Sequence, residues 1–279
     1  MTVSSLPVLR RRLAARGAVG LGAAVRAIPS RLLTSVRTAP VTWSLVGLMV
    51  AIGLLEHAVI GPIHGGRPIG LLSLGALPNV TIPGRGGSTD WWRYVSSTLL
   101  HQNVLHVAGN AVGLLLVGTH TERLYGHLST LTVFTLTAVA AGAIWVTAST
   151  AGLVPLGDYT VGASAGICGL IALQVTFGRL SHTRADRRLA RAGATRGLLA
   201  TGLLVISGLV LPGVNNLAHA AGLTFGVLVG AHVPALPAHG GRPLRAVERV
   251  LMAAVLVAAL VALGFAAQHL VVRLLQPGG

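Results

Sequence analysis

The residues best suited to chemistry lie in three short stretches that are far apart along the chain. VGASAGICGL holds Ser164 among small residues, HQNVLHVAGN ends at Asn110, and NNLAHAAGLTFG holds His219. A serine hydroxyl becomes a good nucleophile when a base takes its proton, and a histidine is suited to that task at neutral pH. These residue types predict acyl-transfer chemistry, with Ser164 as the nucleophile and His219 as the base.

Attack on a carbonyl group creates an oxyanion, which needs hydrogen-bond donors held in place. Asn110 offers its NH₂ group and His106 a ring N–H. The backbone N–H of Ser164 should also be free, because the first turn of a helix has no internal acceptors. Asp158 falls in a loop and Glu122 at the far end of a helix, so neither acid can orient His219. We therefore predict a Ser–His dyad rather than a triad.

The glycines around Ser164 allow other interpretations. Gly162 to Gly166 match G-x-S-x-G, the turn that presents a serine in soluble hydrolases, but apolar segments flank the string on both sides. The same small residues are also typical of helix packing in membranes, and a lone His or Asn often makes only an interhelical hydrogen bond. Helix packing alone does not predict that the serine, the histidine and the asparagine lie at similar depths in the membrane.

The composition is that of an integral membrane protein. Of 279 residues, 53% are hydrophobic and only 10% charged, and the mean hydropathy is +0.75. Soluble domains carry about 25% charged residues, so a soluble α/β-hydrolase is excluded. The net charge of +15 comes from arginines between apolar segments, which indicates topology rather than nucleic-acid binding. A single Cys168 excludes an intrachain disulfide, and no cluster has metal-ligand spacing, so we expect no metal or cofactor.

The predicted spans set the depth of these residues. Spans need about 20 apolar residues, and seven candidates occur at roughly 41–61, 104–121, 128–150, 161–178, 197–212, 215–233 and 247–272. With the N-terminus inside, 17 of the 21 arginines fall in inner segments, which predicts a cytoplasmic N-terminus and an outer C-terminus. Spans two, four and six then start at the outer face. Asn110, Ser164 and His219 lie roughly 5–9 Å below it.

The predicted domains follow from these spans. Residues 1–40 form a basic cytoplasmic arm, with a mitochondrial transit peptide as the alternative. Residues 41–234 form a six-helix core, 235–246 a cytoplasmic linker, and 247–279 a seventh transmembrane helix with an outer tail. Abundant Ala, Arg, Gly and Val without Lys suggest a bacterial protein, and hence the plasma membrane.

Two of the predicted spans must approach closely if Ser164 is to meet His219. Glycine faces let helix backbones touch. Such faces are predicted at Gly162, Gly166 and Gly169 on one helix and at Gly222, Gly226 and Gly230 on the other.

Across about residues 90–230 the sequence resembles the rhomboid family of intramembrane serine proteases. The W-R pair is Trp92-Arg93, nine residues before His101. HQNVLHVAGN matches H-x4-H-x3-N, Gly162-Ala163-Ser164 matches G-x-S, and AHAAGLTFG matches A-H-x-x-G-x-x-x-G. The joint order and spacing carry the resemblance.

The resemblance implies an all-α, polytopic six-helix core plus one C-terminal helix. It implies Ser164 as nucleophile, His219 as base, and Asn110, His106 and the Ser164 amide as oxyanion stabilisers, with His101 structural. The family cuts transmembrane protein substrates near their outer end without metal or nucleotide, so the expected partners are membrane proteins and lipids, not nucleic acid.

This sequence departs from the family pattern at two places. Ala165 stands where a glycine often follows the serine, and Gly118-Thr119-His120-Thr121-Glu122 keeps only the glycine and the acid of G-G-x-x-E. We expect Glu122, with Arg123, to anchor the inner loop.

Several further residues have interpretations of their own. The stretch TDWWRYVSSTLLH predicts an interfacial helix with Trp91, Trp92 and Tyr94 at headgroup level. Cys168 is expected to be a buried filler. Glu56-His57 could pair in the bundle or line a water path, and His269 belongs to an interface or loop.

Two other functions remain open. A catalytically silent rhomboid-like protein would bind membrane clients, and its mark would be the loss of Ser164, His219 or Asn110, all of which are present. A small transporter would need a polar path through the midplane and repeat symmetry. The inner halves of spans two, four and six are apolar and no inverted repeat is evident.

Overall fold

The computed structural model describes residues 32–60, 68–79, 90–153, 158–180, 184–210, 214–239 and 241–275. Most of the predicted N-terminal arm, residues 1–31, lies outside the described residues. So do residues 61–67 and 80–89, between the first two predicted spans, and residues 276–279 of the predicted tail. The described chain is almost entirely helical, which confirms an all-α polytopic protein.

Seven long helices occur in the described residues, at the seven places where the sequence predicts spans. They are α2 (Pro40–Ile60), α5 (Val104–Tyr125), α6 (His127–Thr150), α7 (Ser164–Leu180), α8 (Arg184–Val210), α9 (Asn216–Gly230) and α10 (Ala246–Leu275). Five are long and apolar enough to cross a membrane, whereas the apolar parts of α7 and α9 are shorter. The protein is thus an integral, multi-pass membrane protein; seven crossings and an inner N-terminus stay predictions.

Short elements fill the connections near the start of α5 and α7. Between α2 and α5 lie α3 (Pro68–Leu74), β1 (Leu77–Pro78) and α4 (Arg93–Ser96), and β2 (Tyr159–Thr160) precedes α7. The two strands pair antiparallel, with Leu77 opposite Thr160. A 3₁₀ turn, η2 (Pro237–His239), precedes α10.

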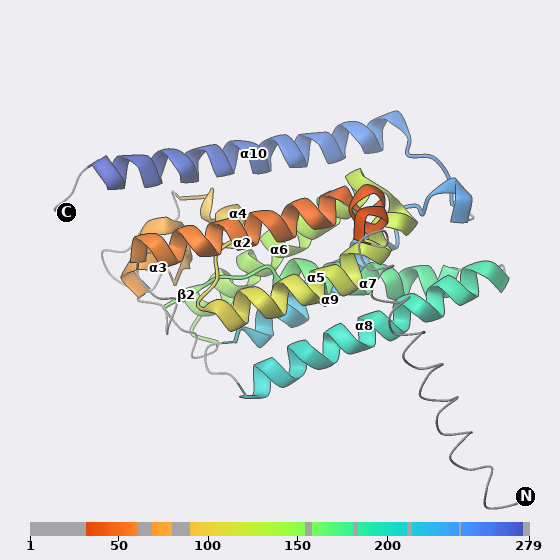
Figure 1. Ribbon diagram of the computed structural model, residues 1–279, viewed down its shortest axis with the longest axis horizontal. Coiled ribbons are helices and arrows are strands. Elements are labelled where there is room, and N and C mark those ends of the chain that lie inside the picture. The colour runs from red at the N-terminus through yellow and green to blue at the C-terminus, as the bar shows by residue number, and fades with distance from the viewer. Residues whose placement is uncertain are drawn as a thin grey trace, which may run out of the picture.

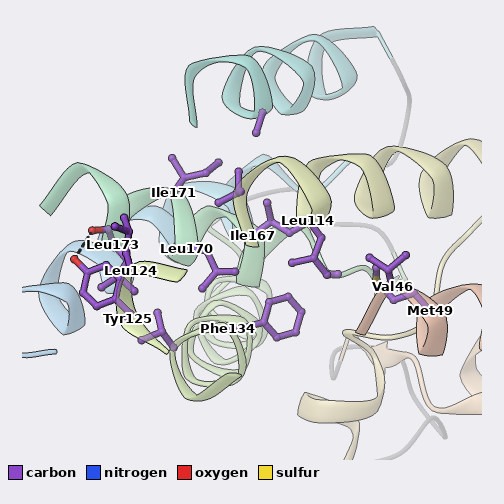
Figure 2. Close-up of a cluster of buried hydrophobic side chains, with 14 of the residues drawn as sticks. Val46, Met49, Leu114, Leu124, Tyr125, Phe134, Ile167, Leu170, Ile171 and Leu173 are labelled. Carbon is purple, nitrogen blue, oxygen red and sulfur yellow. Dashed lines mark hydrogen bonds between the residues drawn. The ribbon is translucent and has the colours of Figure 1, made fainter. Parts of the chain in front are cut away.

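Helix α7 is the central helix of the bundle and packs against α5, α6, α8 and α9. Its side chains Ile167, Leu170 and Leu173 are fully buried and meet Leu114 of α5 and Phe134 of α6 in the main core (Figure 2). Lipid tails are as apolar as these side chains, so close packing and polar contacts, rather than burial itself, hold membrane helices together.

Polar contacts tie the C-terminal half of α7 to α5. Gln174 donates from Nε2 to the Val117 carbonyl and to Thr121 Oγ1, both at 2.8 Å. The Tyr125 hydroxyl donates to the Leu173 carbonyl at 3.0 Å (Figure 2). A hydrogen bond is costly to lose where no water can replace it. These bonds therefore fix how α7 sits along α5.

The glycines of α7 and α9 have different neighbours. A Cβ on Gly222 would overlap the carbonyl group of Ala165, and one on Gly226 would lie 2.6 Å from the Gly169 carbonyl oxygen. The backbones of α7 and α9 therefore touch, as predicted. Gly166 and Gly169, however, point toward Phe134 and Thr137 of α6, so the predicted glycine face of α7 toward α9 is wrong for both, although the Gly169 backbone still meets Gly226. Gly162 precedes α7 and faces His106 of α5. The reason is that α7 is central and must approach α6 as closely as α9.

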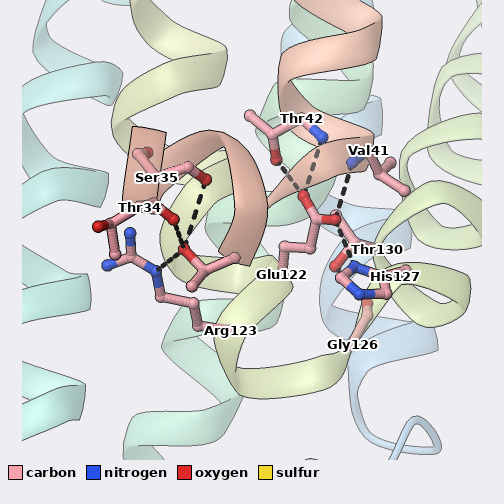
Figure 3. Close-up of polar contacts among 10 residues, drawn as sticks. Thr34, Ser35, Val41, Thr42, Glu122, Arg123, Gly126, His127 and Thr130 are labelled. Carbon is pink, nitrogen blue, oxygen red and sulfur yellow. Dashed lines mark hydrogen bonds and ion pairs between the residues drawn. The ribbon is translucent and has the colours of Figure 1, made fainter. Parts of the chain in front are cut away.

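Glu122 connects the end of α5 to the start of α2 (Figure 3). Its carboxylate accepts from the backbone N–H of Val41 at 2.9 Å and from the N–H and hydroxyl of Thr42 at 2.8 and 2.7 Å. His127 Nδ1 lies 2.6 Å from the same carboxylate. The first amides of a helix have no internal acceptors, so Glu122 supplies them for α2.

Helix α8 is longer than its predicted span of 197–212. It begins at Arg184, 13 residues before the predicted start of the span. Arginine, alanine and leucine are strong helix formers, so the helix continues past its apolar part, which covers Ala190–Val210. Figure 1 shows α8 and α10 on opposite sides of the bundle.

The predicted interfacial helix is also corrected. Only Arg93–Ser96 is α-helical there, and Trp92 is buried at 6% exposure whereas Trp91 is 45% exposed. The headgroup-level position of these residues stays a prediction. Helix α10 packs against α3, α4 and α6 and covers this region. The ring of Trp92 contacts His269 at 5.4 Å and that of Trp91 contacts Phe265 at 5.7 Å between centroids. Thus His269 is a packing residue within α10.

Arg93 holds the turn between α3 and β1. Its guanidinium lies over the Trp92 ring, pairs with Asp90 at 2.8 Å and donates to the carbonyls of Leu72 and Ala76 at 2.6 and 3.0 Å. The planar guanidinium carries five donors in a fixed geometry. The Trp92-Arg93 pair therefore shapes the loop that carries β1.

Candidate active site

Ser164 and His219 meet at the adjacent ends of two helices. Ser164 is the first residue of α7, and His219 lies in the first turn of α9. His219 Nε2 is 2.8 Å from Ser164 Oγ, which is hydrogen-bond distance. Among the described residues no carboxylate forms an ion pair with His219. This geometry allows the imidazole to take the hydroxyl proton.

Asn215 positions the start of α9. Its side-chain oxygen accepts from the Ala218 N–H at 3.0 Å, as an N-cap does, and its Nδ2 donates to Thr160 Oγ1 at 2.9 Å. The His219 helix is thereby tied to β2, just before Ser164. Sequence reasoning missed Asn215, although an asparagine just before an apolar helix is a recognised N-cap signal.

His106 lies on the other side of the serine. Gly162 has φ +119°, and a Cβ on it would sit 2.8 Å from His106 Nε2. A side chain at this position would be strained as well as crowded. Glycine therefore lets the His106 ring approach the backbone that leads into Ser164. The Gly162 N–H donates to the Ser97 carbonyl at 2.9 Å, which holds this loop in place.

Asn110 lies one turn after His106 on α5 and is buried. Its Nδ2 donates to the His106 carbonyl at 3.0 Å. An amide NH₂ has two hydrogens, so the second can be donated to a bound group. Asn110 Nδ2 lies close to Gly162, since a Cβ built on that glycine would be 3.8 Å from it. The i,i+4 spacing thus brings His106 and Asn110 to the same side of the serine.

A pocket opens at these residues. The pocket is lined by Ser164, His219, His106, Thr160, Asn215 and Gly142, together with other small residues. Its wall comes from α5, α6, α7 and α9 and from β2. Nearby, the Tyr159 hydroxyl bonds to the Gln102 side chain, and burial raises the pKa of Tyr159, so the phenol stays protonated. The Ser164 hydroxyl is therefore accessible from this pocket.

His101 is fully buried beside His106. The two rings are edge-on, with centroids 4.9 Å apart. His101 Nδ1 is 3.1 Å from the Leu99 carbonyl oxygen, and its backbone N–H donates to Glu56 Oε1 at 3.1 Å. Glu56 of α2 is thus a neighbour of this side of the site, 45 residues away in sequence.

The remaining predicted residues lie farther from the hydroxyl. Cys168 is buried one turn after Ser164. Gly222 and Gly226 contact α7, Trp92 and Arg93 support the β1 loop, and Glu122 binds the start of α2. In the described part of the chain no group of three or more His, Cys, Asp and Glu side chains has metal-ligand geometry.

The family model for the Rhomboid domain matches residues 88–235, which include every residue of this pocket. The chain belongs to the rhomboid family. This rhomboid is 27% identical over 218 residues to rhomboid protease AarA of Providencia stuartii, covering 72% of this chain and 75% of that protein.

Two further relatives are longer than this chain. Rhomboid protease GluP of Bacillus subtilis is 30% identical over 213 residues, covering 74% of this rhomboid but 38% of that protein. RHOMBOID-like protein 4 of Arabidopsis thaliana is 26% identical over 181 residues, covering 64% and 42%. Family and relatives together support a serine protease of the intramembrane kind.

Proposed function

We propose that this rhomboid is an intramembrane serine endopeptidase that cuts transmembrane proteins near the outer face of a bacterial plasma membrane. The observation that carries the proposal is the 2.8 Å separation of Ser164 Oγ and His219 Nε2. The two residues come from different helices, and a packing role alone does not require an imidazole nitrogen at a serine oxygen.

In the first half of the reaction, His219 Nε2 takes the hydroxyl proton while Ser164 Oγ attacks the peptide carbonyl carbon. The tetrahedral intermediate then collapses, the C–N bond breaks, and His219 gives the proton to the leaving amine. In the second half, His219 deprotonates a water that attacks the acyl-serine ester. The carboxylic acid leaves and the Ser164 hydroxyl is restored.

The oxyanion is stabilised by the Asn110 NH₂ group, the His106 ring N–H and the backbone N–H of Ser164. The last of these lies at the N-terminus of α7, where the helix dipole favours negative charge. Loss of one such donor typically lowers kcat about 10²–10³-fold. A dyad without a carboxylate suffices because the bond to Ser164 and the cap of α9 already orient His219.

Substrates are single-span or polytopic membrane proteins. A peptide bond inside a helix is covered by its own backbone turns, so the segment at the cut must unwind. Helix-weakening Gly or Pro residues near the cut therefore favour cleavage. Water reaches the acyl-enzyme from the outer side, since the dyad lies at the N-terminal ends of α7 and α9, which the predicted topology places there.

The test is cleavage of a generic single-span substrate by the purified protein in proteoliposomes. Ser164→Ala and His219→Ala should abolish cleavage, whereas Cys168→Ala, one turn away on α7, should retain it. A fluorophosphonate should label the wild type and not Ser164→Ala. Wild-type rates in both dyad variants, or an unlabelled wild type, would overturn the assignment. Substrate capture without cleavage would indicate the client-binding alternative.

A further inference from the structure

Glu56 of α2 is a carboxyl group in an unusual place. Its side chain is fully buried, and Oε1 accepts the backbone N–H of His101 at 3.1 Å. Oε2 makes no hydrogen bond to any described residue. No ion pair involves Glu56 in the described part of the chain. A buried carboxylate without a cationic partner is costly, whereas the protonated acid is neutral and carries one O–H donor.

Among the described residues, no side chain of opposite charge pairs with Glu56. The described titratable residues near this end of α2 are His57, His101 and His106, together with Tyr159, which packs in one cluster with Ile52. Helix α3, which packs on α2, contains no titratable residue. The only one on α6 is His127, which lies against Glu122 at the other end. The surroundings therefore favour a protonated Glu56, whose Oε2–H then needs an acceptor.

His101 has the complementary need. Its Nδ1 lies 3.1 Å from the Leu99 carbonyl oxygen, and a carbonyl can only accept. Nδ1 therefore carries the ring proton, and Nε2 is left with a lone pair. Nε2 is buried and makes no hydrogen bond to any described residue. Protonated Glu56 thus has an Oε2–H donor without an acceptor, and the neighbouring His101 has an Nε2 acceptor without a donor.

We propose that Glu56 is a positioning residue for the oxyanion side of the active site. Its protonated carboxyl accepts the His101 N–H at Oε1 and donates from Oε2 to one buried water, which in turn donates to His101 Nε2. This pair of bonds locks the His101 ring, whose edge-on contact at 4.9 Å then holds His106 against Gly162. The proposal rests on the proposed protease function, in which His106 is an oxyanion donor.

The consequence for catalysis follows from the order of contacts. Glu56 does not line the pocket, so substrate binding does not depend on it. His106 acts on charge that develops only in the transition state, and an interaction made only there changes kcat rather than KM. Loss of the Glu56 bonds should therefore lower kcat and leave KM nearly unchanged.

Two substitutions separate this role from a charged or purely structural one. Glu56→Gln keeps an oxygen acceptor and an N–H donor in the same shape, so it should retain kcat within about twofold. Glu56→Leu leaves both His101 groups unpaired and should lower kcat about 10-fold or more, since small displacements of catalytic groups are costly. Leu54→Ala, on the lipid-exposed face of the same helix, is the matched control.

A spectroscopic readout needs no activity. The infrared spectrum of the wild-type protein in lipid should contain a carboxylic acid C=O band that shifts in D₂O and is absent in Glu56→Gln. A wild type without that band, or Glu56→Gln as impaired as Glu56→Leu, would overturn the proposal. If the wild type neither cleaves nor takes up fluorophosphonate, the proposed function fails, yet the infrared band still tests the protonated Glu56.

Discussion

Gly222 of α9 packs directly against the carbonyl group of Ala165, the residue that follows Ser164. The two helices that carry Ser164 and His219 are therefore in backbone contact beside these two residues. A side chain on Gly222 has no room, because the atoms that it would meet belong to the backbone of Ala165 and cannot move aside as a flexible side chain could. The separation of Ser164 and His219 is thus set by this contact.

Gly222→Ala should lower kcat/KM by about 10²-fold or more, because the added Cβ pushes α9 away from α7 and misplaces the base. The check is the cleavage rate in proteoliposomes, together with fluorophosphonate labelling. Gly264→Ala on α10 is the control, since a Cβ there has open space. Equal rates for Gly222→Ala and the wild type would show that α9 does not depend on this contact.

Gly162→Ala should also inactivate the enzyme, for a different reason. Alanine is strained at φ +119°, and its Cβ would lie 2.8 Å from His106 Nε2. We expect kcat to fall about 10²-fold, as on loss of an oxyanion donor, while Gly47→Ala, at an open position on α2, stays active. A normal kcat would mean that His106 can move without loss of oxyanion stabilisation.

Substitutions of Asn215 separate its two hydrogen bonds. Asn215→Ala removes both the α9 cap and the bond to Thr160, and should cost about 1 kcal/mol of stability and lower kcat. Asn215→Asp keeps the capping oxygen but cannot donate to Thr160, so stability should largely return. Thermal unfolding in detergent, measured beside kcat, tests this order. A less stable Asp variant than Ala would contradict it.

Glu122→Ala should destabilise the fold by at least about 2 kcal/mol, because it leaves several buried donors at the start of α2 unpaired. His127→Ala removes only a half-exposed partner of the same carboxylate and should cost less. Denaturant unfolding of the purified protein measures both. Equal losses in the two variants would show that the α2 contacts contribute little.

The contact between α10 and the region around α4 should be visible in stability. Phe265→Ala and His269→Ala each remove a ring partner of Trp91 or Trp92, and each should cost about 1 kcal/mol. Tryptophan fluorescence should also change as Trp92 loses its cover. Leu260→Ala, on the exposed face of α10, should change neither measurement. An unchanged fluorescence in His269→Ala would contradict the covering role.

Much of the fold could be predicted because it rests on local signals. Apolar runs of helical length placed all seven long helices. Two predictions were wrong, each for its own reason. The start of α8 was predicted too late because helix propensity extends the helix past its apolar part. The helix predicted before α5 is shorter than expected, and α10, from a distant part of the chain, covers Trp92 there. The first effect is a local property of the α8 residues themselves, whereas the cover by α10 depends on a contact between distant parts of the chain.

The sequence by itself determined which residues can carry the chemistry and in what order they occur along the chain. It also determined that His106 and Asn110 lie on the same face of their helix, because they are four residues apart. Only the tertiary structure decided which faces meet. Helical periodicity cannot tell that Gly166 and Gly169 both point toward α6, while the backbone of Ala165 and Gly169 meets α9. Likewise, Glu56 reaches His101 only because α2 packs beside the start of α5. Such contacts depend on how helices far apart in sequence settle against one another, and that is a property of the packed bundle.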